Sequence, residues 1–231
     1  MASNIEAMLD VLSDDNYVRN FTQMCFETKE LASWLEQSAA GRVDMFITSE
    51  NGTDSATFLL DMDRFIRGWR EMQVDFMSQL AQIYVRFVVS MPDRLNLQNA
   101  TSTSLMENVT RLAASMRAIP SPDMTHVSGS VYCAVLKSML DTDAATQKAM
   151  RMQLNYIDAS KRSIPSMGQT FASMLPEGDA TNEEMTPRLL FMVSEMMDYS
   201  STLLRSWAHF NHEFNHDFAT FGWARLGCGA G

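Results

Sequence analysis

Cysteine, proline and long apolar runs are all scarce in this sequence, and each scarcity excludes a class of protein. The 231 residues include three Cys, six Pro and ten Gly. Cys25, Cys133 and Cys228 are odd in number and far apart, which excludes a disulfide framework or a zinc knuckle. No apolar stretch approaches the roughly 20 residues of a transmembrane helix, and the first residues lack a signal-peptide core. We therefore expect an intracellular, cytoplasmic chain without a transmembrane segment.

Nucleotide-binding and nucleophile motifs are also absent. The sequence contains no Gly-x-x-x-x-Gly-Lys-Ser/Thr loop, no Gly-x-Gly-x-x-Gly turn and no Gly-x-Ser-x-Gly elbow. Cys25 and Cys133 lie beside apolar residues at helical spacing, which favours inert core thiols over nucleophiles. These absences predict that the chain is not an enzyme and needs no cofactor.

Basic residues are outnumbered by acidic ones, 18 against 28, for a net charge of −10. That balance disfavours binding of a monomer to nucleic acid. Residues 64–162 nevertheless carry 12 bases and 8 acids. Their Arg64, Arg67, Arg70 and Arg86 would contact RNA only in an assembly; ordinary ion pairing with nearby acids is the simpler interpretation.

Helical periodicity is the dominant positive signal, and it predicts an all-α bundle of roughly seven or eight helices. Twenty Met suit the packing of helices and adaptable contact surfaces. Two helices should be long and central, over about 55–91 and 187–221. The first is stopped by Pro92; the second is opened by Thr186-Pro187 and closed by Gly222.

The remaining segments predict shorter helices and one linker. We expect a helix from near Asp15 that stops before Gly41, and then a loop or short edge strand over 42–53. Further helices are predicted over 105–119, over 124–140 (with Val127, Val131, Val135 and Leu136 as its apolar residues) and from a cap at Asp143. The domain prediction is a main helical domain over 1–165 and a linker or loop over 166–186. A C-terminal helix and tail over 187–231 should pack on the same core.

Three of the four histidines lie close together, at His209, His212 and His216. His212-Glu213-x-x-His216 matches the zinc-protease pattern, in which both histidines bind zinc and the glutamate acts as the base. The same letters contain Glu-x-x-His, a pattern of di-iron bundles, with Asp123-x-x-His126 as a loose second copy.

Three observations weaken the catalytic interpretation. Few residues follow His216, and among them Asp217 and Cys228 are the conceivable third ligands. Asn-His-Glu-Phe is followed at once by Asn-His-Asp-Phe, so a repeated unit generates the motif. At 100° per residue the histidines also fall opposite Phe210, Phe214 and Phe218, on the polar back of the helix. Three possibilities remain open: a metal bound by His209, His212 and His216 at the surface or between subunits, a pH-sensitive patch, or a solvated helix face.

The sequence therefore predicts a non-catalytic helical protein that self-associates or binds a protein partner. Matrix, coat, nucleocapsid-associated and scaffold subunits, viral ones among them, belong to this class. The alternative is a metal-dependent enzyme built on the His212-Glu213-x-x-His216 motif.

Overall fold

The computed structural model describes residues 2–91, 98–118, 129–175 and 180–229. Within these residues the chain is all-α, as predicted, and contains no strand. The helices are α1 (Ala2–Ser13), α2 (Asp15–Ser49), α3 (Ser55–Val89), α4 (Gln98–Ala118), α5 (Gly129–Arg162), α6 (Ile164–Ala172) and α7 (Ala180–His212), followed by the π-helical segment η3 (Glu213–Phe218) and α8 (Ala219–Arg225).

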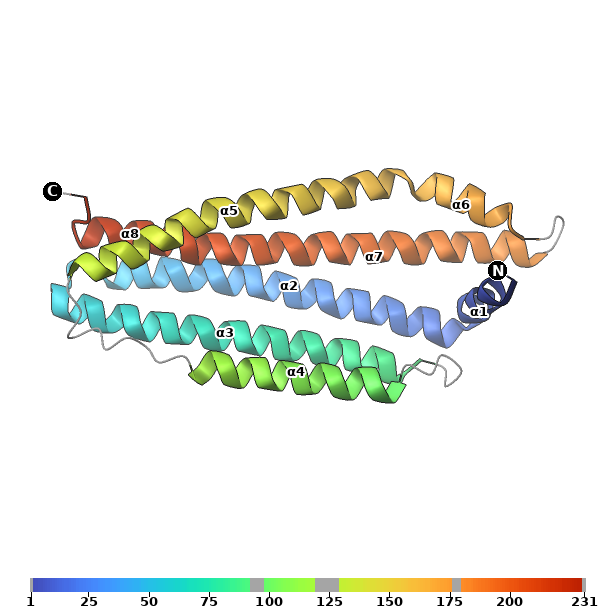
Figure 1. The fold of residues 1–231 in the computed structure, drawn as a ribbon, viewed down its shortest axis with the longest axis horizontal. Helices are drawn as coiled ribbons and strands as arrows, with labels where there is room; N and C mark the ends of the chain where they lie inside the picture. Colours follow the sequence, from blue (N-terminus) through green and yellow to red (C-terminus); the bar gives the residue numbers. More distant parts are fainter. Residues whose placement is uncertain (1, 92–97, 119–128, 176–179, 230–231) are drawn as a thin grey trace.

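Four long helices run side by side along the long axis of the molecule (Figure 1). α2 and α7 form the most extensive helix pair, and α5 packs along α7 on one side. α3 follows α2 as an antiparallel hairpin, and α4 lies on α3 at the opposite edge of the bundle. α1 and α8 lie at opposite ends. α5 is therefore an edge helix with an inner and an outer face.

Aspartate residues cap the N-termini of two of the long helices. The carboxylate of Asp14 accepts hydrogen bonds from the backbone N–H groups of Asn16 and Tyr17, at 2.9 and 3.2 Å. Asp54 does the same for Ala56 and Thr57. Each pair satisfies N–H groups that have no partner inside the helix. The start of α3 is therefore as the sequence predicts.

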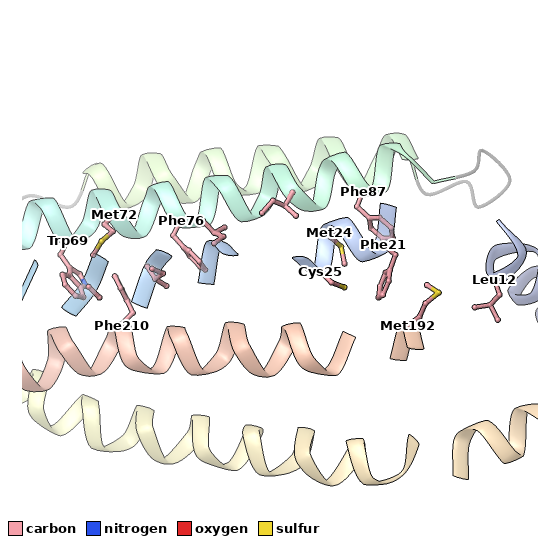
Figure 2. Close-up of a cluster of buried hydrophobic side chains, with 14 of the residues drawn as sticks. Leu12, Phe21, Met24, Cys25, Trp69, Met72, Phe76, Phe87, Met192 and Phe210 are labelled. Carbon is pink, nitrogen blue, oxygen red and sulfur yellow. The ribbon is translucent and has the colours of Figure 1, made fainter. Parts of the chain in front are cut away.

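The main core runs along the bundle axis. Figure 2 shows Trp69, Met72 and Phe76 of α3 near Phe210 of α7. Further along the bundle, Phe21 and Met24 of α2 lie near Phe87 of α3. Trp69 stacks on Phe210 with ring centroids 4.5 Å apart. Cys25 is fully buried, and this burial raises the pKa of its thiol to about 11. Cys25 is thus the inert core thiol that the sequence predicts.

A second core cluster lies where α5, α8 and η3 meet α2 and α3. It contains Phe46, Phe58, Leu136 and Phe218. Gly222 is buried here, and a Cβ at this position would lie 3.2 Å from the Leu136 side chain. Gly222 therefore permits α8 to approach α5 closely. The prediction that Gly222 ends the helix is wrong, because it lies inside α8.

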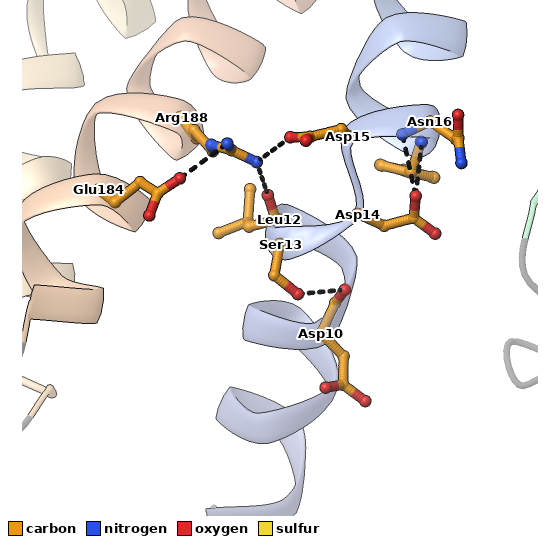
Figure 3. Close-up of polar contacts among 9 residues, drawn as sticks. Asp10, Leu12, Ser13, Asp14, Asp15, Asn16, Glu184 and Arg188 are labelled. Carbon is orange, nitrogen blue, oxygen red and sulfur yellow. Dashed lines mark hydrogen bonds and ion pairs between the residues drawn. The ribbon is translucent and has the colours of Figure 1, made fainter.

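Arg188 fastens the α1 end to α7 (Figure 3). Its guanidinium donates to the carbonyl oxygen of Leu12 at 3.0 Å and pairs with Asp15 at 2.7 Å and Glu184 at 2.8 Å. The fork geometry of arginine allows these contacts at once. The junction between α1 and α2 is thereby tied to the start of α7.

Several predicted helix boundaries are wrong, among them the start at 105 of the helix that begins at Gln98. α2 continues through Gly41 to Ser49, because buried Val43 and Phe46 hold the segment that was expected to be a loop. α5 is one helix, so Asp143 lies buried in its middle and caps nothing. α7 begins at Ala180 and contains Pro187, and α6 occupies part of the predicted linker. The start predicted at 124 and His126 lie outside the described residues.

Cys133 and Cys228 form a disulfide, which the sequence analysis excluded. Their Cα atoms are 5.5 Å apart, within the range that a disulfide requires. A separation of 95 residues does not oppose the bond, because the return of the chain through α7 and α8 brings the two residues together.

Within the described residues, no helix is long and apolar enough to cross a membrane.

Candidate functional site

The histidine cluster lies at a change of helix type. α7 ends at His212, and Glu213–Phe218 form the π-helical segment η3. π-helical turns are rare and often occur at functional sites. In this segment the imidazoles of His212 and His216 stack with centroids 4.6 Å apart and planes at 16°. The local backbone therefore brings two potential ligands to one place.

Each histidine has an acidic neighbour. His209 Nε2 lies 3.3 Å from Glu213 Oε1 and His216 Nδ1 lies 2.7 Å from Asp217 Oδ1. His212 Nδ1 lies 3.1 Å from Oδ2 of Asp143, on α5. The three histidine side chains are between 36% and 47% exposed. Phe210 and Phe218 are buried as predicted, but His212 faces α5 and does not simply face solvent.

Asp143 is a buried carboxylate at the junction of α5 and α7. Its side chain is 8% exposed and contacts His212 through one oxygen. Its other oxygen accepts a 3.3 Å hydrogen bond from the Gln147 amide, which also donates to the Ala208 carbonyl at 2.8 Å. Because a buried carboxylate needs such partners, Asp143 fixes the orientation of the His212 ring.

Glu213 points into less hydrated surroundings than the histidines. Its side chain is 12% exposed. Its pKa is raised, chiefly because burial penalises the carboxylate; Asp217 and Asp44 add to the rise, and His209 and His212 oppose it. This carboxyl belongs to a mixed acidic and imidazole cluster formed by α7, η3 and α2.

One triad of the described residues has the composition and spacing of a metal site. Ligand atoms of His212, His216 and Asp217 all lie within 4.8 Å of one another. This set shares His212 and His216 with the predicted ligands and contains Asp217 in place of His209. Metal binding itself stays a prediction.

A protease-like arrangement would have Glu213 beside the ion as the base. Glu213 is instead within 3.3 Å of His209, and it is not a member of the triad. Among the described residues, Asp217 is the downstream residue that joins the two histidines. The second predicted di-iron motif, Asp123-x-x-His126, lies outside the described residues.

The predicted RNA-contacting arginines lie on α3, beside carboxylates. Arg64 pairs with Asp61 at 2.7 Å, Arg67 pairs with Asp63, and Arg86 pairs with Glu27 of α2. The side chains of these three arginines are more than half exposed. The arrangement matches the ordinary ion pairing considered in the sequence analysis.

A second candidate surface lies on the outer face of α5. Eight exposed residues there repeat at alternating spacings of four and three, and none is charged. We name this set the outer α5 stripe: Val131, Val135, Ser138, Thr142, Ala145, Ala149, Met152 and Tyr156. Such 3.5-residue spacing is that of a coiled-coil seam.

The large members of the outer α5 stripe are well exposed. Val131 and Val135 are each 50% exposed, Met152 65% and Tyr156 74%. Val131 and Val135 were predicted as apolar residues of a helix over 124–140, with a separate helix capped by Asp143. Reading residues 131–156 as one helix would have shown the unbroken heptad spacing.

No protein-family model, curated protein or solved structure matches this chain.

Proposed function

We propose that this chain is a non-catalytic helical interaction protein that self-associates by pairing the outer α5 stripes of two copies. The observation that supports this is the absence of charge along eight consecutive heptad positions of an exposed edge helix. A solvated helix face normally carries charged residues. A second copy of α5 would remove the exposed valines, Met152 and Tyr156 from water.

Antiparallel pairing matches small residues with small ones and large residues with valines. We place the two-fold axis between Thr142 and Ala145. Moving outward, the pairs are then Thr142 with Ala145, Ser138 with Ala149, Val135 with Met152, and Val131 with Tyr156. Small central residues let the two backbones approach, and the larger pairs at both ends bury the most apolar area.

Charges beside the stripe suit the same arrangement. Asp141 and Lys148 lie on the same flank of the stripe, one heptad apart. In the antiparallel pair they lie about 3 Å apart along the axis, with Asp141 of one copy beside Lys148 of the other. The two-fold axis creates this contact twice. Asp141 already accepts from Lys137 at 2.7 Å, so it would sit between two ammonium groups.

Subunits of matrix, coat, nucleocapsid or scaffold assemblies, viral ones included, have this kind of function, and we propose that class for the chain. The predicted intracellular location is not part of this proposal. A reducing cytosol would hold Cys133 and Cys228 as thiols, so the disulfide found here favours an oxidising setting instead. The metal-dependent enzyme is less well supported, since Glu213 is engaged by His209.

Sedimentation equilibrium of two matched variants tests the proposal. Ala145 lies at the centre of the outer α5 stripe, and Ala144 is another exposed alanine beside it. Ala145→Glu would bury two carboxylates at the contact and should raise the dimer dissociation constant at least about 100-fold. Ala144→Glu should change it less than about threefold.

Two outcomes contradict the proposal. Wild-type protein that stays monomeric from micromolar to submillimolar concentration would exclude self-association. Association that Ala144→Glu and Ala145→Glu weaken equally would exclude the outer α5 stripe. Charge reversal adds a third arm: Asp141→Lys and Lys148→Asp should each weaken pairing, and the double variant should restore it.

A further inference from the structure

We propose that His212, His216 and Asp217 bind one divalent transition-metal ion, with Asp143 as the residue that positions His212. This site is independent of the outer α5 stripe, because its three ligands come from the end of α7 and from η3 of a single chain.

Metal binding would require only small movements of the three ligand side chains. Donor atoms from the three side chains lie within 4.8 Å of one another. Two ligands of a tetrahedral zinc ion, each about 2.1 Å from the metal, are about 3.4 Å apart. Rotation of partly exposed side chains can close the difference, since His216 is 47% and Asp217 38% exposed.

The contact between His216 and Asp217 is suited to exchange of a proton for a metal ion. Their Nδ1 and Oδ1 atoms lie 2.7 Å apart, so a hydrogen on Nδ1 would be donated to the carboxylate. A cation can replace that hydrogen and use the same lone pairs. Imidazole and carboxylate donors together favour Zn²⁺, Co²⁺ or Ni²⁺ over Mg²⁺ or Ca²⁺, which prefer all-oxygen sites.

His212 is already oriented for this role. Its Nδ1 faces the buried Asp143 carboxylate at 3.1 Å, which makes Nδ1 the protonated nitrogen and leaves Nε2 with its lone pair available. Carboxylates commonly hold metal-binding histidines in this way. Gln147 in turn holds Asp143 by a hydrogen bond at 3.3 Å. The support therefore comes from α5, a different helix from the ligands.

The spacing of the two histidines explains why they converge. His212 and His216 lie four positions apart, which places them on one face of the helix, and their rings stack there. His209 lies one turn earlier and reaches Glu213. Three protein ligands at a partly exposed position leave the remaining coordination to water.

Titration of tag-free, full-length protein with CoCl₂ tests the site, with d–d absorption as a direct readout of coordination. We expect one Co²⁺ per chain, displaced by ZnCl₂. His216→Ala and His212→Ala should each weaken binding at least about 100-fold. His209→Ala is the matched control, and it should change affinity less than about threefold.

Asp143→Asn tests the positioning role. It keeps the size of the side chain but weakens its interaction with the His212 ring, so affinity should fall about 10- to 100-fold while one ion is still bound. Circular dichroism of each variant checks the fold. If Asp143→Asn binds as tightly as wild type, the positioning role is excluded.

Metal binding and self-association can be tested separately. The titration is repeated on Ala145→Glu, which should bind one Co²⁺ per chain as a monomer. No binding at 100 μM Co²⁺, or equal losses from His209→Ala and His216→Ala, would overturn the metal site. Either result would leave the sedimentation result unchanged.

Discussion

The two faces of α5 carry similar aliphatic residues in very different surroundings. Leu136 on the inner face is 1% exposed and packs beside Gly222 of α8, whereas the adjacent Val135 on the outer face is 50% exposed. Tyr132 is buried on the inner face, and Tyr156 is 74% exposed on the outer face. Apolar character alone therefore does not decide the role of a residue in this helix. The inner face holds the fold together, and the outer face remains available to a second copy.

Removal of the disulfide on the inner side of α5 should have the largest effect on the free energy of unfolding. Replacing Cys133 and Cys228 with Ser opens a loop that spans 95 residues. The unfolded chain then gains conformational freedom, so the free energy of unfolding should fall by about 4–5 kcal/mol. Urea denaturation of the double variant, with reduced wild type as the control, measures this. Equal midpoints for variant and oxidised wild type would contradict it.

Truncation of the buried leucine on the same face should have the next largest effect. Leu136→Ala removes a side chain that fills the space beside Gly222. The resulting cavity should lower the free energy of unfolding by about 2–5 kcal/mol. Chemical denaturation checks the value. A loss below about 1 kcal/mol would mean that α8 does not depend on this contact.

The buried carboxylate of Asp143 in α5 should contribute less to the free energy of unfolding. Asp143→Ala leaves the facing His212 without its buried hydrogen-bond partner and frees one contact of Gln147. We expect a loss of about 1–3 kcal/mol, measured in the presence of a chelator so that no metal contributes. Ala144→Ser, at the exposed neighbouring position, serves as the control. A variant as stable as wild type would show that the contact with His212 is not stabilising.

A substitution on the outer face of α5 should have almost no effect on the stability of the monomer. Val135→Ala removes a half-exposed side chain, so the free energy of unfolding should change by no more than about 0.5 kcal/mol at concentrations where the protein is monomeric. The comparison with Leu136→Ala, one residue away, is direct. Similar losses at both positions would remove the distinction between the two faces.

Periodicity predicted the all-α class and the start of α3. Asp54 precedes an uninterrupted apolar row, so cap and core agree at that point. Gly41 was misread because a glycine inside a helix costs only about 1 kcal/mol, less than the burial of Val43 and Phe46 returns. Local signals were decisive only where tertiary packing agreed with them.

The candidate sites were only partly predictable. The spacing of His212 and His216 is visible in the sequence, but their support by Asp143 is not, because the same Asp looks like a helix cap locally. The presence of Asp217 and not His209 beside the two histidines depends on how the side chains are placed, which the residue pattern does not give. The Cys133–Cys228 bond likewise depends on which helices meet at the α8 end.

The π-helical segment also has a consequence for chain length. A π-helical turn holds one residue more than an α-helical turn between its hydrogen-bonded groups, so η3 accommodates an extra residue without changing the direction in which α8 faces. Deletion of Asn215 should let the segment close into regular α-helix, with Phe218 and α8 still facing the second core cluster. His212 and His216 would then lie three positions apart and lose their stacked arrangement. The fold should therefore tolerate the loss of Asn215, whereas the stacked pair of His212 and His216 requires that residue.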